Sequence, residues 1–198
     1  HHHLWRDGEL VGKLKRDYNP YRIDWHSRLL SPDGRWGAWG CMAVESAGKP
    51  DFTYIAHFDR DKHSTFLSWQ ASHTYLAISV DSRWLLGGED ADYVIWDVTT
   101  WQPVSRLPAS LSDAVPGSAA FSPDGSLLAL EVEHSKIRLL RVGTWEEVLT
   151  LTPPQDIPIV RMAFSPDGRH LFTTGGQILH RWDIARLKTE LEQMGLAW

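Results

Sequence analysis

The stretch FSPDGRHLFTTGGQILHRWD, residues 164–183, decides the fold of this chain. An apolar run enters a Ser-Pro-Asp-Gly turn, a second run leaves it, a glycine pair interrupts that run, and a third run ends in Trp182-Asp183. Proline at the second turn position holds φ at about −65° and glycine closes the turn, so the pattern predicts short strands joined by tight turns. Related stretches begin at Phe121 and Ile78, and a looser copy begins at Leu30.

The four stretches recur at a regular spacing. The serines that open their turns are Ser31, Ser79, Ser122 and Ser165, at intervals of 48, 43 and 43 residues. A period of about 40–45 residues with four strands per unit is typical of the blades of a β-propeller. We therefore predict an all-β propeller with four blades per chain in residues 4–183.

The two ends of the chain depart from this repeat. Residues 5–14 (WRDGELVGKL) share a pattern with residues 101–107 (WQPVSRL) and 145–151 (WEEVLTL), so they are expected to form an outer strand. After Asp183 the apolar residues Ile184, Leu187, Leu191 and Met194 fall on one helical face, which predicts a helix in residues 184–198 instead of an outer strand. We expect the N-terminal strand to close the last blade, in its own chain or in a neighbour's. The histidines at residues 1–3 are interpreted as the remnant of a purification tag.

Composition limits the classes of partner. The chain has 198 residues, 42% apolar and 23% charged, as in a globular protein. Its net charge of −5 offers no basic footprint for nucleic acid, and no apolar run approaches the ~20 residues that span a bilayer. Cys41 is the only cysteine, so no disulfide can form within the chain. We expect a cytoplasmic protein with no nucleic-acid and no membrane partner.

No motif in the sequence predicts catalysis, a metal site or a cofactor. The histidines outside residues 1–3 do not show the spacing of a metal site. The turn serines lack the strained elbow of a nucleophilic serine, and the glycine pairs end strands where a phosphate loop would open a helix. We therefore expect no catalytic, metal-binding or cofactor-binding residues.

The turns and the Trp-Asp pairs resemble those of the WD40-repeat β-propeller family. The resemblance covers nearly the whole chain up to Asp183 and gives structural roles to the repeat motif, which comprises Ser31, Asp33, Gly34, Ser122, Asp124, Gly125, Ser165, Asp167, Gly168, Trp96, Asp97, Trp182, Asp183 and His73. Leu140-Arg141 replaces Trp-Asp in the third unit, and the first unit lacks the pair. The buried His–Asp–Ser/Thr–Trp hydrogen-bond network of the family is therefore expected to be incomplete in most blades.

The resemblance implies a non-enzymatic scaffold that binds proteins or peptides, as part of a larger bacterial multidomain protein. Such propellers bind partners through loops on their top face, and the residues expected to anchor a partner are Trp36, Trp39, Tyr54 and Arg83. We expect two copies to complete an eight-bladed ring as a homodimer. The alternatives are a larger propeller of which this chain is a fragment, or closure of one chain with four blades. Two other functions stay open: a small-molecule-binding or enzymatic propeller that uses the central channel, and an engineered arrangement of repeat units.

Overall fold

The structure is a computed structural model of the chain. It describes the backbone of residues 2–6, 9–14, 21–43, 52–57, 64–68, 76–89, 92–108, 118–196 and 198. Side chains are described for residues 28–38, 55, 77–87, 92–108, 118–133, 135–196 and 198.

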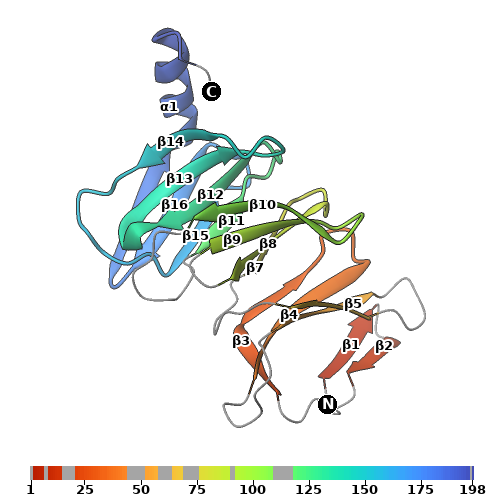
Figure 1. Cartoon of the computed structure of the whole chain (residues 1–198). Helices are drawn as coiled ribbons and strands as arrows, with labels where there is room; N and C mark the ends of the chain where they lie inside the picture. Colours follow the sequence, from red (N-terminus) through yellow and green to blue (C-terminus); the bar gives the residue numbers. More distant parts are fainter. Residues whose placement is uncertain are drawn as a thin grey trace.

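The described strands form a hairpin and four antiparallel sheets, which we call blades 1 to 4 in chain order (Figure 1). The hairpin consists of β1 (His2–Arg6) and β2 (Glu9–Leu14). Blade 1 contains β3 (Tyr21–Leu30), β4 (Trp36–Ala43), β5 (Phe52–His57) and β6 (Ser64–Ser68). Blade 2 contains β7 (Leu76–Ile78), β8 (Trp84–Glu89), β9 (Asp92–Asp97) and β10 (Gln102–Pro108).

The C-terminal half repeats this plan with one change. Blade 3 contains β11 (Ala119–Phe121), β12 (Leu127–Val132), β13 (Lys136–Arg141) and β14 (Glu147–Leu151), with a short 3-10 helix, η2 (Glu133–Ser135), between β12 and β13. Blade 4 has three strands, β15 (Arg161–Phe164), β16 (His170–Gly175) and β17 (Ile178–Asp183). The helix α1 (Ile184–Gln193) follows β17 directly.

The blades follow one another as an arc. Their first strands contact each other in chain order, β3 with β7, β7 with β11, and β11 with β15. No comparable contact joins β15 to β3 within the described residues, so the arc is open. In Figure 1 the sheets succeed one another from orange to blue, with the N-terminal hairpin and α1 at opposite ends. The predicted all-β propeller fold with a short C-terminal helix is confirmed.

Among the residues whose side chains are described, the core consists of three apolar clusters, each between two neighbouring blades. The strand β12 contributes to two of these clusters, because all six of its residues are buried. Leu128 and Leu130 pack against blade 2, whereas Leu127 and Ala129 pack against blade 4. Successive side chains of a strand point to opposite faces, so a blade covered on both sides needs a continuous apolar run rather than an alternating one.

Blades 2 and 3 have a turn after their third strand that blade 4, with its three described strands, does not share. In blades 2 and 3 the carbonyls of Asp97 and Arg141 accept the N–H groups of Trp101 and Trp145 at 2.7 and 2.8 Å. Each tryptophan is left-handed, with φ of +54° and +60°, and this conformation turns the chain back into a fourth strand. After Asp183 the sequence IARLKTELEQ is rich in helix formers, and the chain continues as α1.

The N-terminal strand does not close the last blade of its own chain. The strand β2 pairs with β1, and β17 pairs only with β16 among the described strands. The prediction of closure within one chain is therefore wrong, whereas closure between two chains stays a prediction. His2 and His3 belong to β1, opposite Leu14 and Lys13, and the interpretation of residues 1–3 as a tag remnant stays a prediction.

Candidate interaction surfaces

The turn serines and aspartates are engaged in the turns themselves. The Ser122 hydroxyl accepts the N–H of Leu127 at 2.9 Å and donates to Asp124 at 2.6 Å, while Asp124 accepts the N–H of Ser126 at 3.0 Å. The same arrangement recurs at the turns that begin at Ser79 and Ser165. In blade 1 the Ser31 hydroxyl accepts the N–H of Trp36 and donates to its carbonyl oxygen. These hydroxyl groups position the turns. His170 contacts the Ser165 hydroxyl through its backbone, and no imidazole that could activate a serine is among these contacts.

These contacts hold the turn carboxylates in their charged form. Burial raises the pKa of the Asp33 and Asp124 carboxyl groups, but hydrogen bonds from the turn serines and from backbone N–H groups outweigh it, so both pKa values lie below normal. The Ser165 hydroxyl is the main cause of the lowered pKa of Asp167. A carboxylate that accepts several hydrogen bonds resists protonation, because protonation removes acceptor capacity.

Turns of adjacent blades lie side by side. The Ser82 hydroxyl accepts the N–H of Asp33 at 3.1 Å, which joins the turns of blades 1 and 2. Ser82 is left-handed, with φ of +61°, at the position that glycine occupies in the other three turns, where Gly34, Gly125 and Gly168 have φ of +69°, +72° and +70°. A Cβ on Gly125 would lie 3.5 Å from Val80, so the turn of blade 3 also lies against that of blade 2.

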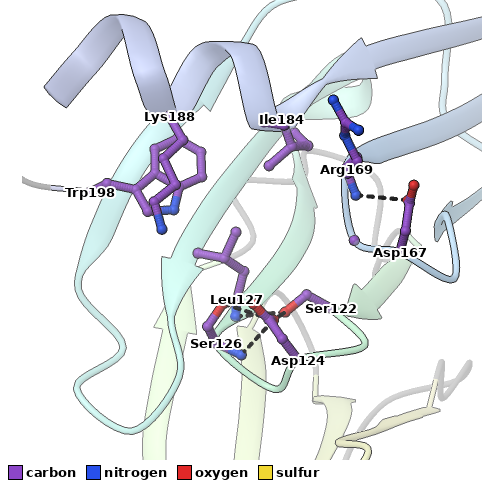
Figure 2. A pocket seen from close by; sticks show the side chains of 11 residues that line it. Ser122, Asp124, Ser126, Leu127, Asp167, Arg169, Ile184, Lys188 and Trp198 are labelled. Carbon is purple, nitrogen blue, oxygen red and sulfur yellow. Dashed lines mark hydrogen bonds between the residues drawn. The ribbon is translucent and has the colours of Figure 1, made fainter. Parts of the chain in front are cut away.

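A recess of about 190 Å³ separates the turns of blades 3 and 4. Figure 2 shows Ser122, Asp124 and Leu127 on one side, Asp167 and Arg169 on the other, and Lys188 and Trp198 near α1. The carboxylates that line it are already bonded within their turns.

The Trp-Asp pairs act within their blades. The Thr99 hydroxyl is the main cause of the lowered pKa of the buried Asp97 carboxyl, and the Arg83 guanidinium, 3.4 Å away, lowers that pKa further. The Trp182 ring N–H donates to the Thr173 hydroxyl at 3.4 Å. Asp183 caps α1 by accepting the N–H of Arg186 at 3.0 Å. Trp96 packs against the cluster between blades 1 and 2, and His73 lies outside the described residues.

Only one of the four predicted partner anchors lies on the described surface. Trp36 is 3% exposed and packs in the core between blades 1 and 2, so its predicted role as a surface anchor is wrong. Arg83 is exposed, but its guanidinium stacks 4.3 Å above the Trp84 ring and pairs with Asp97. Trp39 and Tyr54 oppose each other in β4 and β5, and their side chains lie outside the described residues.

A repeated tryptophan contact joins neighbouring blades; the recurrence of tryptophan in the repeats suggests packing, but it does not predict which rings meet. The left-handed Trp101 of blade 2 meets Trp36 of blade 1 edge to face, with ring centroids 5.4 Å apart. Trp145 of blade 3 meets Trp84 of blade 2 in the same way at 5.3 Å. Between blades 3 and 4 the corresponding position is Leu127, which lies in one cluster with Ile184 of α1. The signal in the sequence was the recurrence of tryptophan at equivalent repeat positions.

A buried carboxylate, which sequence reasoning missed, joins blades 3 and 4. Glu131 is 3% exposed, and its two carboxylate oxygens accept the N–H groups of Ser118 at 2.9 Å and Ile159 at 3.1 Å. The Ser118 hydroxyl in turn accepts the N–H of Met162 at 2.9 Å, so β15 is tied to the same group. The Glu131 carbonyl also accepts the hydroxyl of Tyr93 at 3.0 Å, which extends the contact to blade 2.

The outer face of blade 4 is uncovered. We call this face the open flank; it comprises Arg161, Ala163, His170, Phe172, Thr174, Leu179 and Arg181, which lie opposite or next to one another across β15, β16 and β17. Leu179 is 63% exposed, although its equivalents in blades 2 and 3, Tyr93 and Ile137, are fully buried. Phe172 is half-buried, whereas its equivalent in blade 3, Ala129, is fully buried. The exposed apolar side chains on this face, among polar ones, make it a candidate site for binding another protein surface.

The described residues offer no other evident site. They contain no group of three or more His, Cys, Asp or Glu side chains placed to hold a metal ion. None of the helices that the structure describes has the length and apolar character needed to cross a bilayer.

Successive antiparallel sheets joined through their first strands, with apolar clusters between neighbours, define the β-propeller class of repeat proteins. Residues 145–183, which run from the fourth strand of blade 3 to the third strand of blade 4, match the family described as WD domain, G-beta repeat. The Ser-Pro-Asp-Gly turns and the Trp-Asp strand ends agree with this match, which supports a WD40-repeat family. Domains of this family generally mediate interactions between proteins.

Comparison with solved structures supports the same fold. The chain is similar to Kuenenia stuttgartiensis hydrazine synthase, with a TM-score of 0.59 and 19% sequence identity. The match covers 81% of this chain and 46% of that one, so this chain spans less than half of its length. At this identity the likeness concerns the fold alone. No curated protein matches the chain.

Proposed function

We propose that this protein is a non-catalytic, propeller-type scaffold that binds other proteins. The observation that carries the proposal is the open flank of blade 4. At positions where blades 2 and 3 bury Tyr93 and Ile137 completely, blade 4 exposes Leu179. Burying an exposed leucine contributes about 1.5–3 kcal/mol, so a protein surface that covers this flank gains favourable free energy.

A non-enzymatic role is supported by the way the polar side chains are used. The turn serines and aspartates donate and accept hydrogen bonds within their own turns. Glu131, the buried carboxylate of blade 3, is bonded to backbone N–H groups of its own and the following blade. These groups stabilise the fold, and a reaction would need groups that stay available to a substrate.

We further propose that the protein assembles with itself, two copies completing one ring. The open arc supports this, because β3 and β15 lack the contact that joins every other pair of neighbouring first strands in the described part of the chain. Work in the cytoplasm, and membership of a larger bacterial protein, also stay predictions.

Light scattering coupled to size-exclusion chromatography at rising concentration tests the role of the open flank. The variant Leu179→Glu places a charge at the centre of the flank, and Val104→Glu is its matched control, since Val104 is 46% exposed on the outer strand of blade 2. We expect the unchanged chain and Val104→Glu to assemble, and Leu179→Glu to stay at 22.6 kDa. Equal behaviour of all three proteins, together with no protein partner in cross-linking mass spectrometry, would contradict the proposal.

A further inference from the structure

The third strand of blade 4 has a free edge. In blades 1, 2 and 3 the third strand pairs on both sides, with the second strand and with a fourth. Within the described residues β17 pairs with β16 alone. An unpaired edge presents a row of N–H and C=O groups that can accept a further strand.

The other blades show what this edge lacks. In blade 2, Leu107 of the fourth strand lies opposite Tyr93 and is 9% exposed. In blade 3, Leu151 lies opposite Ile137 and is 5% exposed. In both blades a leucine on the fourth strand therefore helps to cover the position that corresponds to Leu179.

One segment of the chain has the sequence of such a fourth strand. Val104 and Leu107 in β10 are three residues apart, as are Val148 and Leu151 in β14. The strand β2 repeats this spacing with Val11 and Leu14, which places Leu14 at the position of Leu107 and Leu151. In the described part of the chain β2 pairs only with β1, so its second edge is available to another strand without opening the hairpin.

The donor strand has to come from another molecule. Figure 1 places the β1–β2 hairpin at the opposite end of the arc from α1, which follows β17 directly. Because the arc is open, the hairpin of the same chain does not reach the edge of β17.

We propose that strand Glu9–Leu14 of a second copy adds to the free edge of β17 as an antiparallel fourth strand, with Leu14 opposite Leu179. The inference rests on the proposed self-assembly and names the contact that would produce it. A second, reciprocal contact would add the hairpin of the first copy to the second copy's blade 4, and the resulting dimer would be closed by two-fold symmetry.

Engineered cysteines test the pairing and its register. Residues directly opposite in an antiparallel pair have Cα atoms about 4.5–5.5 Å apart, within the range of about 4.4–6.8 Å that a disulfide spans. With Cys41→Ser as the background, Leu14→Cys and Leu179→Cys are made as separate proteins and mixed under mild oxidation. We expect a covalent species that combines both variants and migrates at about twice 22.6 kDa until it is reduced.

Two controls separate the possible results. Leu14→Cys mixed with Val104→Cys should give no such species, because β10 is already the fourth strand of blade 2 and lies outside the proposed contact. A chain with both Leu14→Cys and Leu179→Cys should form the cross-link between molecules; an internal cross-link, or none in the mixture, would overturn the proposal. If Leu179→Glu abolishes assembly but the mixture does not cross-link, the flank binds protein and only the strand addition fails.

Discussion

The buried carboxylate of Glu131 gives the sharpest prediction about stability. In Glu131→Gln the amide oxygen can still accept one of the two N–H groups, from Ser118 or Ile159, but the amide nitrogen then faces the other as a second donor. A lost hydrogen bond to a charged group and a buried unpaired N–H each cost about 1–3 kcal/mol, and removal of a buried charge offsets part of this. We expect the free energy of unfolding to fall by about 1–3 kcal/mol.

Thermal unfolding followed by circular dichroism measures this loss. For a chain of this size 1 kcal/mol lowers the Tm by about 2–4 °C, so the expected decrease for a loss of about 1–3 kcal/mol is roughly 2–12 °C. Hydrogen exchange adds a local measurement, since the amides of Ser118 and Ile159 should lose protection while the Leu127 amide, bonded to Ser122, keeps it. Glu133→Gln is the control, because Glu133 is exposed and paired only with Lys136, and its Tm should change little. An unchanged or raised Tm in Glu131→Gln would refute the assigned role of the carboxylate.

Three further predictions concern the contacts between blades and the turns. Trp145→Ala removes the edge-to-face contact with Trp84, so we expect urea titration to show a loss of about 2 kcal/mol in the free energy of unfolding. Trp145→Gly should lose less, because glycine adopts the φ of +60° at this position without strain. No loss of stability in either variant would contradict the contact. Gly175→Ala would place a Cβ 2.2 Å from the Pro158 carbonyl oxygen, so we expect a loss of at least about 1–3 kcal/mol, and a Tm equal to that of the unchanged chain would show that the loop yields. The turn aspartates have lowered pKa values in the folded protein. Their charged carboxylates therefore stabilise the fold fully above the unfolded pKa of about 3.9, and this stabilisation is lost as the pH falls through the lower pKa values of the folded state. A Tm that stays constant from pH 5 to pH 2 would contradict this.

The turns and the helix could be predicted because their determinants are local. A serine, an aspartate two residues later and a residue that tolerates positive φ are close enough in sequence to bond one another, and they form the same turn even where Asp81-Ser82 replaces Asp-Gly. The shared pattern of residues 101–107 likewise indicates an outer strand, and β10 spans Gln102–Pro108. The helix start at Asp183 depends on a capping side chain and the period of the residues that follow, both visible in the sequence.

The contacts between blades could not be predicted because they join residues far apart in the chain. A strand that begins with Trp36 gives no sign that Trp101 will cover that ring, so a core residue was mistaken for a surface anchor. Glu131 interrupts an apolar strand, and only its bonds to the backbone at Ser118 and Ile159 explain the interruption.

The alternative in which the N-terminal strand pairs with β17 of its own chain is wrong for a related reason. Asp7-Gly8 is a dipeptide typical of tight hairpins, and it lies between β1 and β2. Closing a short loop costs less conformational entropy than bringing together the two ends of a long chain. The local hairpin therefore forms within the molecule, and β2 pairs with β1.

The order of contacts between the first strands, β3 to β7 to β11 to β15, makes the molecule a linear series of coupled units. Its stability is then a sum over the interfaces between neighbouring blades, and a substitution has a different effect at each interface. Loss of the interface at Glu131 separates blade 4 alone from the rest of the series. Loss of the interface at Trp84 and Trp145 separates blades 1 and 2 from blades 3 and 4.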